Sequence, residues 1–81
     1  MYRVAYTDEA LAERRAIPAE RRKPFEEGMR EIGRFPYDSG SSAVKGNRDR
    51  REATVSGLAV IRYEVSPSVL IVTVLRLVPL P

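Results

Sequence analysis

The sequence predicts an α+β fold with the element order β-α-α-β-β-β, in which two N-terminal helices pack on one face of a small, mostly antiparallel sheet. Three observations support this. A short alternating stretch comes first and is followed by two helix-forming segments. Residues 50–65 then alternate around a glycine, as a β-hairpin does, and residues 69–78 are nearly all apolar and β-branched. The 81 residues predict one domain, 1–81.

The N-terminal segment predicts a strand that leads into a helix. Tyr2, Val4 and Tyr6 alternate with other residues, as in a strand whose aromatic face is buried. Thr7 suits the N-cap position, and two acidic residues follow it where the helix dipole favours negative charge. A helix is therefore expected from residue 8 to about residue 16.

A second helix is predicted from Pro18 to about residue 34. Proline is favoured at the first position of a helix, and the Phe-Pro pair at 35–36 ends the pattern. Pro24 leaves two possibilities open, because a proline within a helix either kinks it or marks its true start. The buried stripe of this helix consists of apolar residues spaced by four and three positions, Phe25, Met29 and Ile32.

Residues 36–47 are rich in Pro, Gly, Ser and Asn, which predicts a loop before the hairpin. The hairpin register follows if the alternating apolar residues of both strands face one core. Paired residues must then both have odd numbers or both have even numbers, so the turn between the strands contains an odd number of residues. A three-residue turn at 56–58 fits, with glycine at its centre. This register places Glu52 opposite Arg62. The shared inner face consists of Ala53, Val55, Ile61 and Tyr63, so Tyr63 is predicted to be a core residue rather than a catalytic acid.

The last predicted strand, Val69 to Val78, is apolar enough to be buried on both faces and therefore central in the sheet. Arg76 is its only charged residue. Two placements of Arg76 remain open: the open face of the sheet near Arg62, or the point at which the strand emerges into solvent.

The composition excludes several kinds of site. The chain has no Cys and no His, so disulfides, thiolate metal sites and histidine-based catalysis are not available. No metal or cofactor is expected. The N-terminus lacks the pattern of a signal peptide, and no apolar run reaches the length of a membrane span. A soluble cytoplasmic protein is therefore expected, without membrane association.

Positive charge is concentrated in one short segment. Between residues 45 and 51, four basic side chains accompany only Asp49, whereas the N-terminal half is nearly neutral. Such a cluster suits a polyanion or an acidic protein partner. The alternative is that this cluster reflects an arginine-rich composition and has no function. The four basic residues are Lys45, Arg48, Arg50 and Arg51.

Short motifs along nearly the whole chain carry a family resemblance. They are Tyr2-Arg3-Val4, Thr7-Asp8-Glu9-Ala10, Ile17-Pro18, Ile32 and Pro36 at the end of the second helix, Val44-Lys45-Gly46, Arg50-Arg51, Gly57, and Ile61 to Val65 followed by the VTVLRLV strand. In their order and spacing they resemble the RelE/ParE toxin superfamily of bacterial type II toxin-antitoxin modules. The resemblance implies a microRNase-like fold, with helices on one face of the sheet and the functional site on the other.

The resemblance also implies a function. It suggests a toxin that acts on mRNA at the ribosome as a metal-independent endoribonuclease (an mRNA interferase) and so inhibits translation. Alternatives are a ParE-like inhibitor of DNA gyrase, a catalytically degenerate toxin-like binding protein and a small RNA-binding module. The implied partners are a cognate antitoxin, mRNA and the ribosome or DNA gyrase, and a second copy of the chain as a homodimer within a toxin-antitoxin complex.

The same resemblance points to site residues. The catalytic candidates are Lys45, Arg50, Arg62 and Arg76. The RNA-binding candidates are Lys45, Arg48, Arg50 and Arg51. The sequence departs from the family pattern, because Val60 stands at a position that the family fills with arginine, and Glu52 and Thr54 stand where ribonucleases of the family often carry lysine.

Overall fold

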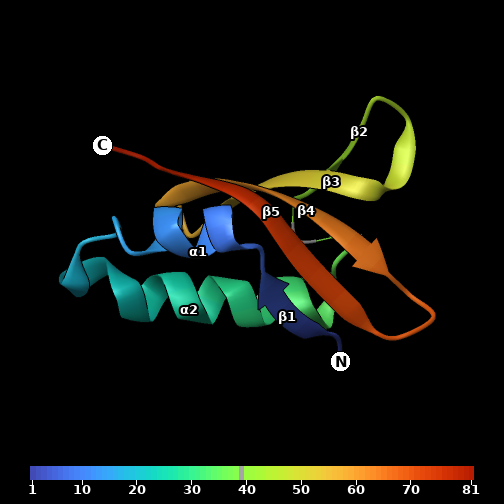
Figure 1. Ribbon diagram of the computed structural model, residues 1–81, viewed down its shortest axis with the longest axis horizontal. Coiled ribbons are helices and arrows are strands. Elements are labelled where there is room, and N and C mark those ends of the chain that lie inside the picture. Colours follow the sequence, from blue (N-terminus) through green and yellow to red (C-terminus); the bar gives the residue numbers. More distant parts are fainter. Residues whose placement is uncertain (39) are drawn as a thin grey trace.

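The computed structural model describes residues 1–38 and 40–81, and Figure 1 shows a sheet with both helices on one of its faces. The five strands lie in the order β1-β5-β4-β3-β2; β1 is parallel to β5, and the other neighbours are antiparallel. This confirms the predicted α+β fold. The elements are β1 (Arg3–Tyr6), α1 (Asp8–Arg14), α2 (Ala19–Arg34), β2 (Ser42–Val44), β3 (Asn47–Val55), β4 (Ala59–Ser66) and β5 (Ile71–Pro79).

The hydrophobic core lies between the helices and the inner face of the sheet. The predicted stripe of α2 is buried there, together with the alternate residues of β3, β4 and β5. Tyr63 is fully buried, and its hydroxyl donates a hydrogen bond of 2.6 Å to the carbonyl of Pro36. Tyr63 is therefore a core residue, as its parity predicts.

Both helices form near their predicted positions. Thr7 is the N-cap of α1 and accepts a hydrogen bond from the amide of Ala10. This helix ends at Arg14, two residues earlier than expected, because residues 15–17 bond three positions back instead of four. The second helix runs without interruption from Ala19 through Pro24, so the start near Pro24 is excluded.

Close packing of α2 against the β3–β4 turn depends on Gly28. A Cβ atom at this position would lie 2.5 Å from both Ser56 Oγ and Val55 Cγ1, so only glycine fits without displacing these two side chains. The hydroxyl of Ser56 also donates to the carbonyl of Pro24 at 2.8 Å. These contacts fix the hairpin on the helix layer.

The hairpin has the predicted register. Val55 pairs with Ala59 around a turn at residues 56–58, and Glu52 pairs with Arg62. Ser56 and Gly57 both have positive φ angles, of 52° and 67°. The inner and outer faces of β3 and β4 are therefore the ones that the alternation predicts.

The prediction of a loop over residues 36–47 is only partly right, because it contains the short strand β2; residue 39 lies outside the described residues. β2 pairs with the edge of β3 through a two-residue turn at Lys45 and Gly46, both with positive φ. Three small or half-buried residues give no alternating signal of their own. The strand exists because the neighbouring strand supplies its hydrogen-bond partners.

β5 is central in the sheet, as predicted, but it is not buried on both faces. Its outer residues are only half-buried and Val78 is exposed, because the helices cover one face alone. The alternation is also interrupted: Tyr63 pairs with Val74 and Arg62 with Arg76, so Leu75 forms a β-bulge. The bulge moves Arg76 to the outer face beside Arg62, which settles its placement.

No helix in the described part of the chain combines the length and the apolarity that crossing a membrane requires.

Candidate nucleic-acid interface

The candidate site lies on the face of the sheet that the helices leave uncovered, here called the outer face. It is formed by the outward residues of β3, β4 and β5 and by the β2–β3 turn. In Figure 1 this turn extends away from the helices. The outward side chains alternate in charge and polarity: Arg50, Glu52, Thr54, Val60, Arg62, Glu64, Arg76 and Val78.

Two cross-strand ion pairs join β3 to β4 on the outer face. Arg62 Nε donates to Glu52 Oε2 at 3.0 Å, and Arg50 Nη2 lies 3.3 Å from Glu64 Oε2. All four side chains are about half exposed. Ion pairs at such exposure contribute little to stability, about 0–1 kcal/mol. An incoming phosphate can therefore replace either carboxylate at a small energetic cost.

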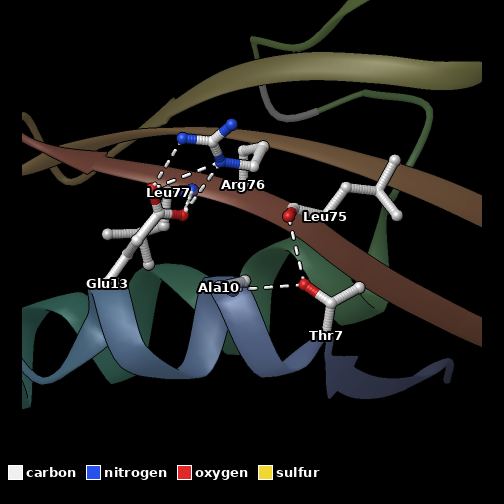
Figure 2. A network of polar contacts seen from close by, with 6 residues as sticks. All are labelled: Thr7, Ala10, Glu13, Leu75, Arg76 and Leu77. Carbon is white, nitrogen blue, oxygen red and sulfur yellow. Dashed lines mark hydrogen bonds and ion pairs between the residues drawn. The ribbon is translucent and has the colours of Figure 1, made fainter.

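Arg76 has a different partner, from the helix layer. Figure 2 shows its guanidinium beside Glu13 of α1, with an Nη2–Oε2 distance of 3.0 Å. The hydrogen bond from Arg76, together with one from the backbone amide of Leu77, lowers the pKa of the Glu13 carboxyl. Arg76 is thus held at the boundary between the outer face and α1.

The β2–β3 turn presents the predicted Lys45, and the predicted Arg50 follows on β3. The side-chain oxygen of Asn47 accepts hydrogen bonds from the amides of Asp49 and Arg50 at 3.1 and 3.3 Å and shapes the backbone that follows the turn. A hollow of about 400 Å³ lies here. It is lined by Val44, Lys45, Asn47, Arg50 and Arg62.

This first hollow has the character of an anion site. Three of its five lining side chains are cationic and none is acidic. Among the residues that the structure describes, Arg50 Nε is the buried side-chain atom without a hydrogen-bond partner.

A second hollow, of about 260 Å³, adjoins the first and shares Arg62 with it. It combines charged and apolar side chains, so it can contact both a polar sugar and an apolar surface. Its lining residues are Glu52, Val60, Ile61, Arg62, Arg76 and Val78.

Arg48 and Arg51 lie outside both hollows. Arg48 stacks on the ring of Tyr37 at 4.3 Å, and the Tyr37 hydroxyl donates to Asp49. Arg51 faces inward and is only 8% exposed. Its guanidinium bonds to Ser41 Oγ and to the carbonyls of Tyr37, Ser41 and Arg48. The structure thus brings Lys45, Arg50 and Arg62 together, with Arg76 nearby, whereas Arg51 fastens the preceding loop and is withdrawn from the site.

Three residues of this surface were missed in the sequence. Asn47 falls at the end of the loop predicted for residues 36–47, and asparagine is a typical turn-forming residue. Glu64 shares the parity of Arg62, so the predicted register already put it opposite Arg50. Glu13 gave no signal, because its contact with Arg76 depends on the bulge at Leu75.

Comparison with known proteins identifies the fold. No protein-family model matches the sequence, and no curated protein matches it. Solved structures match over the whole chain: the isolated RelE toxin of E. coli shares 17% identity at a TM-score of 0.81, covering 100% of this chain and 86% of that one. This chain has the RelE fold.

Two complexes with that fold extend the comparison. The RelBE2 toxin-antitoxin complex of Mycobacterium tuberculosis gives a TM-score of 0.82 at 17% identity and covers 98% of both chains. The archaeal RelE–RelB complex of Pyrococcus horikoshii gives 0.72 at 19% identity, covering 96% of this chain and 93% of that one. The RelE-like resemblance predicted from the motifs is confirmed at the level of the fold.

Proposed function

We propose that this chain is the toxin component of a type II toxin-antitoxin module and cleaves mRNA at the ribosome as a metal-independent endoribonuclease. The observation that carries the proposal is the convergence of Lys45, Arg50 and Arg62 on one hollow of the outer face, in a chain with the RelE fold. The hollow accepts a phosphodiester of single-stranded RNA.

The chemistry of RNA cleavage explains why this arrangement is suitable. Attack of a ribose 2′-oxygen on the adjacent phosphorus creates a crowded phosphorane that carries additional negative charge. Preorganised cations stabilise that charge more than the charge of the starting phosphodiester, which lowers the barrier. Arg50 and Arg62 supply planar donors, and Lys45 supplies a compact charge at the rim.

A cognate antitoxin is the proposed protein partner. The compared structures from M. tuberculosis and P. horikoshii are complexes of toxins with antitoxins. On the present chain, an antitoxin segment with acidic side chains would complement the cationic hollow and exclude RNA from it. We also propose that two copies of the toxin pair as a homodimer within such a complex.

One observation favours a second candidate function, that of a non-catalytic or gyrase-directed toxin. Arg50, Arg62 and Arg76 each already have a carboxylate partner, and Val60 lies beside Arg62 in the second hollow. A surface of this kind can bind a protein without cleaving RNA. The experiment that tests the proposal must therefore separate RNA cleavage from growth inhibition alone.

Controlled induction in bacterial cells tests the proposal. We expect growth arrest with new 5′ ends inside translated regions of mRNA, and loss of both effects with Lys45→Ala or Arg62→Ala. Lys23→Ala, an exposed charge on α2, is the matched control and should retain both effects. Arrest with intact mRNA and inhibited DNA supercoiling would support the gyrase-directed function, and unaffected growth would exclude a toxin.

A further inference from the structure

The proposed reaction needs a group that removes the proton of the 2′-hydroxyl, and the cations of the outer face cannot provide it while they remain protonated. The chain has no His. Tyr63 is buried in the core, Tyr37 donates its hydroxyl proton to Asp49, and Tyr2 and Tyr6 lie beside α2. No phenol therefore lines either hollow. The bases that remain at the outer face are the carboxylates of Glu52 and Glu64.

Position distinguishes the two carboxylates. Glu52 lines the second hollow, which shares Arg62 with the cationic hollow, whereas Glu64 lines neither. Glu52 also lies two residues from Arg50 on the same face of β3, a separation of about 7 Å along a strand. A ribose attached to a phosphate in the cationic hollow can therefore reach Glu52.

The contacts of Glu52 suit a proton acceptor. Its Oε2 accepts the hydrogen bond from Arg62 Nε, and within the described residues its Oε1 has no hydrogen-bond partner. One oxygen is thus held in place while the other remains available to a substrate.

We propose that Glu52 is the general base of the endoribonuclease, an inference that rests on the proposed function. Glu52 Oε1 takes the proton of the 2′-hydroxyl as the 2′-oxygen forms a bond to phosphorus and the bond from phosphorus to the 5′-oxygen breaks. Water protonates the departing 5′-oxygen, and the proton on Glu52 neutralises the hydroxide formed. The products are a 2′,3′-cyclic phosphate and a 5′-hydroxyl, with no net consumption of water.

Single-turnover cleavage by purified protein on ribosome-bound mRNA tests this inference. Glu52→Gln keeps the shape of the side chain but lowers basicity, and we expect the rate to fall by about 10²–10⁴-fold. Glu27→Gln removes an exposed carboxylate on α2, away from both hollows, and its rate should stay within about threefold of wild type. Glu52→Asp retains a carboxylate and should recover part of the rate.

Two further readouts separate a base from a merely structural residue. The wild-type rate should rise with pH in the acidic range, because only the ionised carboxylate accepts a proton, and Glu52→Gln should lose this dependence. Glu52→Gln should bind RNA with a 2′-deoxy nucleotide at the scissile position at least as tightly as wild type, because it removes a negative charge.

The outcomes also distinguish this inference from the proposed function. An inactive wild-type protein overturns the endoribonuclease and the base with it. An active wild type whose Glu52→Gln variant keeps its rate, or keeps the acidic dependence, overturns only the role of Glu52. If the Glu52→Gln protein does not fold, the wild-type profile decides: a wild-type rate that does not rise with pH in the acidic range overturns the role of Glu52 as the base.

Discussion

The carboxylate of Glu13 accepts a hydrogen bond of 2.9 Å from the backbone amide of Leu77 and so occupies the edge of β5 where no strand lies. β1 ends at Tyr6, and Thr7 then donates from its hydroxyl to the carbonyl of Leu75 at 3.1 Å (Figure 2). Side chains of α1 thus satisfy backbone groups that a longer β1 would satisfy. The helix start and the sheet edge form one unit, which also positions Arg76.

Loss of the Glu13 charge should destabilise the protein only where that carboxylate is ionised. Its pKa in the folded protein is lowered, so its stabilising contribution is present above the ordinary carboxyl pKa and is lost as the pH falls through the folded-state value. Glu13→Gln should therefore lower the melting temperature by several degrees at pH 7, and the difference should shrink at acidic pH. Thermal unfolding at several pH values checks this. An equal difference at all pH values would contradict the role of the charge.

Gly28→Ala should destabilise the protein, although alanine is the better helix former by about 1 kcal/mol. The added Cβ would lie 2.5 Å from both Ser56 Oγ and Val55 Cγ1, and overpacking of this kind costs about 1–3 kcal/mol. Urea denaturation shows directly whether the free energy of unfolding falls or rises. Glu27→Ala, at the neighbouring exposed position of α2, serves as the control and should change stability by less than about 0.5 kcal/mol. A stabilised Gly28→Ala would show that the turn moves away freely.

Arg51 should act on stability rather than on RNA affinity. Its buried guanidinium bonds to the carbonyls of Tyr37, Ser41 and Arg48, and Arg51→Ala leaves them without these donors. A loss of about 2–4 kcal/mol is expected from urea denaturation. Arg51→Lys should restore little of it, because an ammonium group cannot reproduce the planar fork. Wild-type stability combined with lost RNA binding would instead make Arg51 a contact residue.

The salt dependence of RNA binding should depend on the cations that line the first hollow. Each phosphate contact with single-stranded RNA contributes about −0.7 to the slope of log affinity against log salt concentration. Lys45→Ala should therefore reduce the magnitude of the slope by about 0.7. Lys23→Ala, on the helix layer, should leave it unchanged. Fluorescence anisotropy with a labelled single-stranded RNA measures both, and equal slopes for Lys45→Ala and wild type would remove Lys45 from the interface.

The alternation of apolar and polar residues along β3 and β4 was sufficient to predict which side chains of these strands face the core. The parity of Ile61 and Tyr63 against Val55 determines the turn length and the pairing of Glu52 with Arg62, because a shift by one residue would expose the core. The bulge at Leu75 leaves no trace in an unbroken apolar run. Its effect on Arg76 therefore becomes visible only in the strand pairing.

The remainder of the site depends on contacts that local patterns do not encode. β2 is too short to show a period, and its pairing with β3 comes from the tertiary arrangement. Arg51 lies on the inner parity of β3, yet its partners are backbone carbonyls of a preceding loop rather than a motif. Sequence patterns thus located the basic segment, whereas the structure determined which of its cations share a hollow.

Incubation of the purified protein with ribosomes carrying a defined mRNA tests the central claim most directly. The RNA is read by primer extension, and the chemistry of its new ends is determined. We predict cleavage within the ribosome-bound message to a 2′,3′-cyclic phosphate and a 5′-hydroxyl, with loss of cleavage in Arg62→Ala and retention in Lys23→Ala. Intact mRNA with folded wild-type protein, or equal cleavage by Arg62→Ala, would contradict the assignment of an endoribonuclease site to the outer face.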